Sequence, residues 1–397
     1  ACNMCCLYCY QHGKTQERMT FETAKQTVDF LLSDRVNNYI DPEKSECIIL
    51  DFIGGEPLLE IDLIDQFMDY FIYQSFKLNH RWANHYIISM SSNGALYETP
   101  KVQNFIKKYA GRVHIGITID GNKELHDSCR VYRDGRGTYD DVVRNFQLAL
   151  KQGNTPSTKV TIAPENLKYL CESTLHLFGL GLKWLHCNVV FEDVWNVEHA
   201  KELYRQLKML ADIVIEKELY KNHINTMFDE SIGTPLEESD NQNYCGGDGS
   251  MLAIAPDGTC YPCLRYMDYC FSTKNREPLV IGHICSGIVN VEECPKLKEL
   301  RSLTRKSQST DECFYCPIAK GCSWCSAFNY DIYGTANKRT TFHCTMQKAR
   351  VLANCYYWNK LYRHLNLSKR FPYYMPNEWA LEIIDQDEIN MLKELAG

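Results

Sequence analysis

The chain has 397 residues, enough for one large domain and a smaller one. A net charge of −7 argues against a general nucleic-acid-binding protein, which is usually basic, and no apolar run is long enough to cross a membrane. Twenty cysteines in a chain of this size predict metal ligation in a reducing compartment, and therefore a cytoplasmic protein, rather than a disulfide scaffold.

The first nine residues carry three closely spaced cysteines. Cys2, Cys6 and Cys9 follow the pattern C-x-x-x-C-x-x-C, and Tyr8 precedes the last of them. Three thiolates on one loop can hold three irons of a 4Fe–4S cluster. The fourth iron is then open, and open metal positions suit catalysis better than a structural role. A zinc knuckle or one half of a zinc ribbon is the alternative interpretation.

Strand and helix patterns alternate after this loop. Apolar runs predict buried strands at residues 47–53, 86–92, 113–119, 159–163 and 184–191. Helical periodicity lies between the runs and continues in a long helix around residues 203–214. Repeated strand-then-helix order predicts a parallel sheet with right-handed crossovers, whose carboxyl end carries the chemistry. A strand that delivers the first cysteine loop is expected upstream of Cys2, so we expect the natural chain to begin earlier.

The first predicted strand ends in a segment that can contact a ligand. Its residues are Gly54-Gly55-Glu56-Pro57, and the glycines let the backbone approach a ligand closely. The carboxylate of Glu56 can accept a hydrogen bond from an ammonium group. An ordinary strand-to-helix turn is the alternative role of this segment.

Together, the cysteine loop and this segment resemble the motifs of the radical S-adenosylmethionine (SAM) enzymes. In that family, SAM chelates the open iron of the cluster and a G-G-E-P segment holds the SAM amino group. The match is letter for letter, and the matching residues are Gly54, Gly55, Glu56 and Pro57.

Later segments extend the resemblance. Ser92-Asn93-Gly94 resembles the T-N-G segment that lies near the SAM ribose and carboxylate. Residues 118–121, followed by His126-Asp127 and Arg130, resemble the family's S-x-D-G and H-D-x-x-R segments. The residues implied to bind SAM are Ser92, Asn93, Asp120 and Arg130. Arg130 would pair with the SAM carboxylate, whereas His126-Asp127 has the alternative role of fixing a loop.

The second half of the chain carries another set of cysteines. Residues 221–243 are polar and aperiodic and are expected to be a linker. Cys245 is then followed by Gly258 after twelve residues and by Cys263 after four more. Further cysteines stand at Cys313, Cys316, Cys322, Cys325 and Cys344. A pair of zinc sites is the alternative interpretation, because C-x-x-C repeats also suit zinc.

This pattern resembles the SPASM domain, an extension with two auxiliary iron–sulfur clusters on some radical SAM enzymes. The departure is that two residues separate Cys322 from Cys325, where the family usually has three. The resemblance implies one fully ligated cluster on Cys313, Cys316, Cys322 and Cys344. It implies another cluster on Cys245, Cys263 and Cys325. Candidates for a fourth ligand of the latter are Cys260, Cys270 and Cys285. Without a fourth ligand, an open iron there can bind a substrate thiolate.

The expected fold class is α/β. A partial (β/α)6 barrel of the radical SAM type, with its first strand missing upstream, is expected over residues 1–220. The linker and an auxiliary-cluster domain over residues 244–345 follow. Residues 346–397 are expected to be helical, with a last amphipathic helix at residues 377–395 that docks on the barrel.

The resemblance implies an enzyme with three 4Fe–4S clusters and SAM, whose 5′-deoxyadenosyl radical removes a hydrogen atom from the substrate. The leading hypothesis is a maturase that installs a thioether cross-link from a substrate cysteine in a ribosomally made precursor peptide. Carbon–carbon cross-linking, formylglycine formation in sulfatases and a non-catalytic metal-binding scaffold are the alternatives. The implied partners are a precursor peptide with its leader and an electron donor such as flavodoxin or ferredoxin. Neither nucleic acid nor a membrane is expected as a partner, and no residue is singled out as catalytic base.

Overall fold

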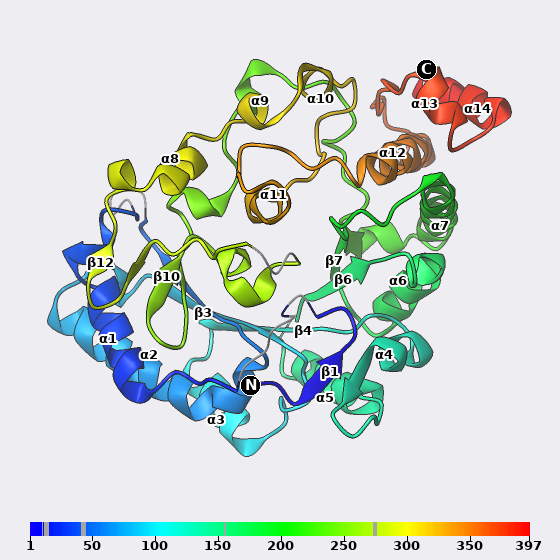
Figure 1. Cartoon of the computed structure of the whole chain (residues 1–397). Helices are drawn as coiled ribbons and strands as arrows, with labels where there is room; N and C mark the ends of the chain where they lie inside the picture. Colours follow the sequence, from blue (N-terminus) through cyan, green and yellow to red (C-terminus); the bar gives the residue numbers. More distant parts are fainter. Residues whose placement is uncertain (10, 12–15, 41–44, 155, 273–275) are drawn as a thin grey trace.

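The computed structural model describes residues 1–397 with the exception of residues 10, 12–15, 41–44, 155 and 273–275. In the larger part of the molecule the strands lie inside and the helices lie outside them, in an arc that runs from α1 to α7 (Figure 1). One parallel sheet contains, in spatial order, β2 (Ile48–Phe52), β3 (Tyr86–Ser92) and β4 (Val113–Ile117).

A second parallel sheet continues the first. Its strands, in order, are β6 (Thr158–Ile162), β7 (Trp184–Val189) and β8 (Ile224–Asn225). The N–H of Ile117 in β4 donates to the carbonyl oxygen of Ser157, directly before β6, at 3.1 Å, so the two sheets meet edge to edge. The strands predicted from the apolar runs are confirmed. β8 lies among the residues expected to form a linker, because two strand residues give no readable alternation.

Each strand buries one face against the helices and leaves the other face open. In β3, Ile88 and Met90 are buried, whereas Ile87, which precedes them, is 42% exposed. Ile49 of β2 pairs with Ile87 and is 62% exposed. Because successive side chains of a strand point to opposite faces, these side chains lie on the face that the helices do not cover.

The helices of the arc begin at residues that can cap them. Thr20 Oγ1 accepts from the N–H of Thr23 at 3.0 Å, and Asn196 forms a capping box with His199. Pro100 occupies the first turn of its helix, where its missing N–H costs nothing. The helices are α1 (Phe21–Leu31), α2 (Ile61–Lys77), α3 (Pro100–Lys108), α4 (Lys123–Cys129), α5 (Tyr139–Lys151), α6 (Leu170–Gly179) and α7 (Val197–Glu216).

The cysteine-rich second half forms a small sheet and short helices beside the barrel (Figure 1). The antiparallel strands are β9 (Ala253–Ile254), β10 (Thr259–Tyr261), β11 (Gly282–His283) and β12 (Gly287–Ile288). The helices are α8 (Pro295–Ser302), α9 (Arg305–Gln308), α10 (Asp311–Phe314) and α11 (Ser326–Tyr333). Tyr39 connects the two parts, because its buried hydroxyl donates to the carbonyl oxygen of Gly247 at 2.5 Å.

The C-terminal helices dock on the barrel, as the sequence predicts. α12 (Cys344–His364) packs along α7, where the Tyr356 hydroxyl donates to Asp212 Oδ1 at 2.6 Å. The single helix predicted at residues 377–395 is wrong. The structure has α13 (Asn377–Leu381) and α14 (Gln386–Ala396), separated at Asp385, whose side chain accepts from the N–H of Glu388 at 2.8 Å and starts a new helix.

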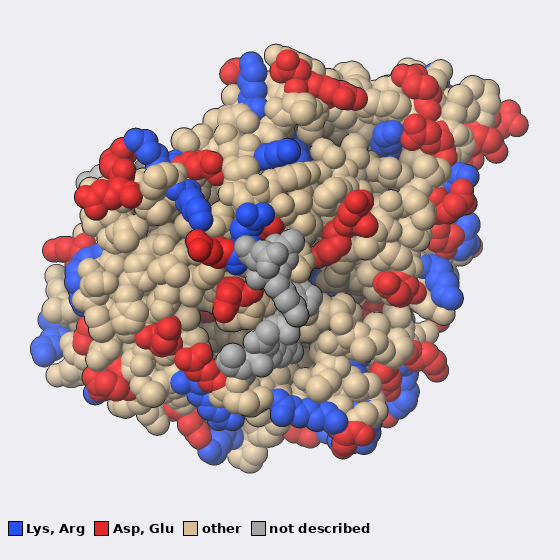
Figure 2. Space-filling view, in the orientation of Figure 1, with Lys and Arg blue, Asp and Glu red and all other residues tan. Residues whose placement is uncertain are grey.

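The surface carries both signs of charge. On the described part of the face shown in Figure 2, acidic and basic side chains are interspersed and no broad basic patch is present. Among the described residues, no helix combines the length and the hydropathy that a membrane span requires.

Candidate active site

The first cysteine loop is held by a strand pair that the sequence pattern does not predict. β1 (Met4–Cys6) pairs antiparallel with β5 (Arg130–Tyr132), and Cys6 lies opposite Arg130. The N–H of Cys9 donates to the carbonyl oxygen of Cys6 at 3.4 Å, so a tight turn joins these two cysteines. Strands of three residues are too short to show alternation, so only the tertiary structure reveals this pair.

The G-G-E-P segment lies directly against this loop. The N–H of Glu56 donates to the carbonyl oxygen of Ala1 at 3.0 Å. A Cβ atom on Gly55 would lie 2.1 Å from the same oxygen and 2.9 Å from the Cβ of Cys2. Glycine at position 55 therefore permits the close approach of the two segments. The predicted SAM-binding segment and the predicted core cysteines are brought together.

We expect Gly55→Ala to reduce the iron content by up to about four atoms per chain, because the added methyl group displaces the Cys2 segment. Iron and sulfide analysis of the anaerobically reconstituted protein measures this loss. Gly179→Ala at the end of α6 is the matched control, since nothing lies within 4 Å of its added Cβ. Full iron loading of the Gly55→Ala protein would contradict the close packing seen here.

The carboxylate of Glu56 is buried and already hydrogen-bonded. Oε1 accepts from Ser92 Oγ at 2.8 Å and from the N–H of Leu58 at 3.0 Å, and Oε2 accepts from the N–H of Asn93 at 2.7 Å. Burial raises the pKa of Glu56, although these hydrogen bonds lower it. They use three of about four lone-pair positions of a carboxylate. Glu56 therefore joins the ends of β2 and β3, and its predicted contact with an ammonium group is restricted to the remaining position.

Asn93 and Asp120 connect further strand ends to the cysteine loop. Asn93 Nδ2 donates to Asn3 Oδ1 at 2.7 Å. The buried Asp120 accepts at Oδ2 from the Tyr8 hydroxyl at 2.5 Å and from Arg130 Nε at 2.9 Å. These predicted SAM-binding residues thus position the loop as well, which the motif alone does not indicate.

The guanidinium of Arg130 lies between Asp120 and the cysteine loop. Nη1 donates to Cys6 Sγ at 3.7 Å, and the guanidinium carbon lies 5.2 Å from the centroid of the Tyr8 ring. Burial lowers the pKa of Arg130, but Asp120, Tyr8 and Cys6 outweigh it and raise the pKa overall. A guanidinium has five N–H donors, so a donor remains for an incoming carboxylate.

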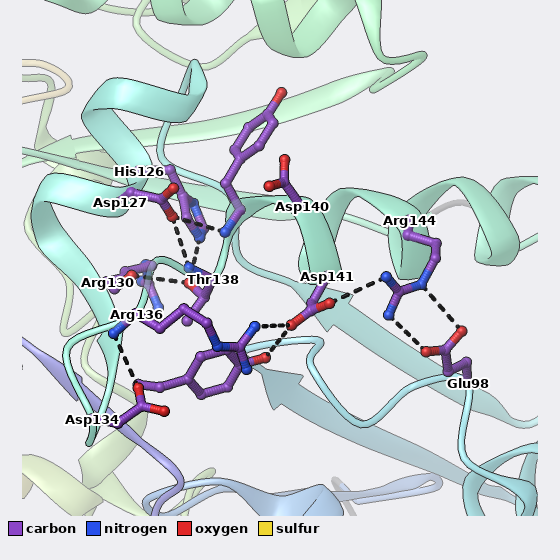
Figure 3. A network of polar contacts seen from close by, with 12 residues as sticks. Glu98, His126, Asp127, Arg130, Asp134, Arg136, Thr138, Asp140, Asp141 and Arg144 are labelled. Atoms are coloured by element: carbon purple, nitrogen blue, oxygen red, sulfur yellow. Dashed lines mark hydrogen bonds and ion pairs between the residues drawn. The ribbon is translucent and has the colours of Figure 1, made fainter.

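His126 and Asp127 fix the loop between α4 and α5 (Figure 3). Asp127 Oδ1 accepts from the N–H of Thr138 at 2.7 Å and of Tyr139 at 2.8 Å. Nε2 of the fully buried His126 lies 3.0 Å from Thr138 Oγ1. Thr138 Oγ1 in turn donates to the carbonyl oxygen of Arg130 in β5 at 2.9 Å. These contacts support the structural role of the pair.

Burial lowers the pKa of His126 from 6.5 to about 4. The unfolded chain therefore binds a proton at a pH where the folded protein leaves this ring neutral. We expect the free energy of unfolding to fall by about 3 kcal/mol between pH 6.5 and pH 4. Urea unfolding at a series of pH values measures this slope. His126→Gln should flatten it, and an unchanged slope in this variant would assign the loss to other groups.

Cys245, Cys263 and Cys325 converge in the second half of the chain. Burial, and after it the thiols of Cys325 and Cys245, raise the pKa of Cys263 to about 12. Cys245 Sγ lies 2.8 Å from Ser326 Oγ, which accepts from the Tyr266 hydroxyl at 3.1 Å. The three cysteines that the resemblance assigns to one cluster therefore lie together.

The structure describes all three candidate fourth ligands, and Cys270 shares the nearby Arg265 with Cys263. Burial raises the pKa of Cys260 to about 12, and Cys260 lies within β10. Burial also raises the pKa of Cys270 to about 12, and the nearby thiol is that of Cys9 in the first loop. Cys285 is exposed, and its thiol donates to a glutamine side chain of α1 at 3.7 Å.

The other four predicted ligands converge at a second place. They are Cys313, Cys316, Cys322 and Cys344. Desolvation of its thiol, and after it the charges of the other three thiols, raise the pKa of Cys344 to about 11. Burial alone would raise the pKa of Cys322, but His343, Arg339 and Arg305 lower it to about 6. Arg339 Nη2 donates to Cys322 Sγ at 3.0 Å.

Cations near both cysteine sets are functional candidates that sequence reasoning missed. Lys159 in β6 lies near Arg265 and Cys325. Arg305 and Arg339 lie beside Cys322. The fold brings each of these cations to its site from another segment, so no spacing motif marks it.

The two cysteine sets and the first loop suit clusters in their ligand chemistry. In the described parts of the chain, no three His, Cys, Asp or Glu side chains are close enough to hold one metal ion. Each thiolate of a 4Fe–4S cluster binds a different iron, so cluster ligands stand farther apart than ligands of a single ion.

Comparison with known proteins decides the family. Residues 1–172 match the Radical SAM superfamily. Uncharacterized protein MJ0907 of Methanocaldococcus jannaschii is 32% identical over 307 residues, which cover 76% of this chain and 90% of that protein. The chain belongs to the radical SAM superfamily. A Cysteine-type anaerobic sulfatase-maturating enzyme of Clostridium perfringens is 24% identical over 284 residues, or 67% of this chain and 72% of that enzyme.

Solved structures show the fold of this radical SAM protein. Native anSMEcpe with bound AdoMet superposes with a TM-score of 0.65 at 19% identity, over 92% of this chain and 96% of that one. SuiB of Streptococcus suis bound to precursor peptide SuiA gives a TM-score of 0.55 at 13% identity. The match covers 85% of this chain and 72% of the SuiB chain. The predicted α/β barrel with a cysteine-rich SPASM-type domain and C-terminal helices is confirmed, and the protein is an enzyme.

Proposed function

We propose that this radical SAM enzyme acts on a cysteine of a peptide or protein, and that its product is a thioether in a ribosomally made precursor peptide. The observation that carries the proposal is the convergence of the thiols of Cys245, Cys263 and Cys325. A cluster held by three thiolates has an open iron, which suits a substrate thiolate.

In this proposal, different residues of the chain bind the core cluster and SAM. Cys2, Cys6 and Cys9 hold the core cluster, and the G-G-E-P segment and Arg130 hold SAM. When bound, SAM would supply methionine and a 5′-deoxyadenosyl radical, and this radical would take a substrate hydrogen atom to give 5′-deoxyadenosine. The thiol proton would go to water, a C–S bond would form and the remaining electron would pass to an auxiliary cluster. Flavodoxin or ferredoxin supplies the electron that cleaves SAM.

Sulfatase maturation is the second candidate, because relatives that the chain resembles include Cysteine-type and Serine-type anaerobic sulfatase-maturating enzymes. In the cysteine case the substrate carbon is oxidised by two electrons and then hydrolysed. The sulfur leaves as hydrogen sulfide and an aldehyde remains. The two candidates therefore differ in whether sulfur stays in the product.

Product mass separates the candidates. The reconstituted enzyme is incubated anaerobically with SAM, dithionite and either a Cys-bearing precursor peptide or a sulfatase-derived peptide. Loss of two hydrogens with a thiol that no longer reacts with an alkylating agent supports the thioether. Loss of sulfur with a new aldehyde supports formylglycine, and loss of two hydrogens with a free thiol supports a carbon–carbon link.

Iron content tests the cluster assignment separately. About twelve irons per chain are expected, and about eight in the Cys245→Ala, Cys263→Ala, Cys325→Ala triple variant. Zinc without sulfide in the second half of the chain would contradict the auxiliary clusters, and with them the reason to prefer a thioether.

A further inference from the structure

Two buried arginines flank the four-cysteine set. Arg305 and Arg339 are only 5% and 6% exposed. Arg305 donates to the carbonyl oxygens of Cys322 and Ala319 at 3.0 and 3.1 Å. Arg339 donates to the carbonyl oxygens of Cys322 and Ser323 at 3.0 and 2.7 Å, and to Cys322 Sγ at 3.0 Å. None of these described acceptors is a carboxylate. The sulfur of Cys322 is therefore the group among them that can carry the negative charge opposite the two guanidiniums.

Both guanidiniums also keep unused donors. Arg305 Nε and Arg339 Nη1 are buried and have no hydrogen-bond partner among the described residues. Buried donors in folded proteins are normally satisfied. A cluster on the adjacent thiolates offers further negatively charged sulfur atoms as acceptors. The arrangement therefore fits an anionic iron–sulfur group next to Cys322.

We propose that Arg305 and Arg339 raise the reduction potential of the cluster held by Cys313, Cys316, Cys322 and Cys344, and so make it the receiving end of the electron path. The inference rests on the cluster assignment of the proposed function. Reduction adds one negative charge to the cluster, and two buried positive charges favour that state. Net charge and hydrogen bonds to sulfur are among the determinants of iron–sulfur potentials.

The other auxiliary set has a different environment. The sulfur of Cys245 contacts the hydroxyl of Ser326. Lys159 near Cys325 and Arg265 near Cys263 retain solvent-exposed surface, so water screens their charges. The positive charges beside the four-cysteine set belong to Arg305 and Arg339, which are buried. Electrostatic interactions are stronger in the protein interior than in water. An electron is therefore favoured at the four-cysteine set.

Redox potentiometry followed by electron paramagnetic resonance tests this inference. It is performed on the intact enzyme and on a full-length variant in which the six cysteines of the other two clusters are alanine. Those cysteines are Cys2, Cys6, Cys9, Cys245, Cys263 and Cys325. We expect Arg339→Gln and Arg305→Gln each to lower the equilibrium constant for reduction about tenfold, a shift of about 59 mV to a more negative potential for a one-electron couple.

Two controls separate charge from structure. Arg339→Lys keeps the charge and should remain close to the wild-type potential. Lys320→Gln removes a charge two residues from Cys322, but this ammonium lies 3.5 Å from Asp240 and is half-exposed, so no shift is expected.

The outcomes are distinct. A negative shift in the glutamine variants with unchanged iron, sulfide and signal intensity supports the inference. An unchanged potential with the cluster intact overturns it. Loss of iron from both glutamine variants also overturns it, because the arginines would then hold the cluster rather than tune it. If the wild-type protein held no iron at these four cysteines, the cluster assignment would be refuted. The proposed reaction itself is tested independently by the product mass.

Discussion

Replacement of Cys6 by alanine is expected to abolish the reductive cleavage of SAM. The core cluster would keep two of its three predicted thiolate ligands, and Arg130 would lose the sulfur at 3.7 Å from its Nη1. Production of 5′-deoxyadenosine from SAM and dithionite, measured by chromatography, should fall below detection. The iron content should fall by about four atoms per chain, while the auxiliary clusters remain.

Cys5→Ala provides the matched control for this experiment. Cys5 is adjacent to Cys6 in β1 and is exposed, and it pairs through its backbone with Val131. Its side chain points to the opposite face of the strand from that of Cys6. SAM cleavage by the Cys5→Ala protein should match the wild type. Full activity of the Cys6→Ala protein, or equal losses in both variants, would contradict the assignment of Cys6 as a cluster ligand.

Removal of the positive charge in Arg130→Met is expected to destabilise the barrel by about 3–5 kcal/mol. Nε of Arg130 donates to Asp120 Oδ2 at 2.9 Å, and the two side chains are 12% and 4% exposed. Without Arg130 the carboxylate of Asp120 stays buried beside the cysteine loop with only the Tyr8 hydroxyl as a side-chain donor among the bonds described for it. Urea unfolding of the anaerobic protein measures the loss.

A double-mutant cycle identifies the source of this loss. Asp120→Asn in the Arg130→Met background should recover part of the stability, because it removes the unpaired charge. Arg144→Met is the comparison at the surface, where Arg144 contacts Glu98 at 2.7 Å and the two side chains are 55% and 44% exposed. That change should cost far less stability than the loss of Arg130, because water screens an exposed pair. Equal losses for the buried and the exposed pair would contradict a special role for the buried one.

The pattern of apolar residues along the chain was enough to predict the main strands, and the family resemblance was enough to group the cysteines. The strand predicted at residues 86–92 has the same bounds as β3, in which buried and more exposed side chains alternate as the strand period requires. The resemblance to the SPASM domain assigns Cys245, Cys263 and Cys325 to one set, and the fold brings them together. The sequence pattern did not reveal β1, β5 and β8, whose two or three residues are too few to show a period.

The amino-acid sequence alone determined which side chains can carry the chemistry, because thiol spacing and the G-G-E-P segment are local properties of the chain. Only the tertiary structure decided what those side chains contact. Glu56 accepts a hydrogen bond from Ser92 at the end of β3. Asp120 accepts hydrogen bonds from Arg130 and from Tyr8 of the cysteine loop. Arg339 reaches Cys322 across sixteen intervening residues. Such contacts depend on how distant segments pack together and on which charged groups that packing shields from water. A local sequence pattern contains neither kind of information.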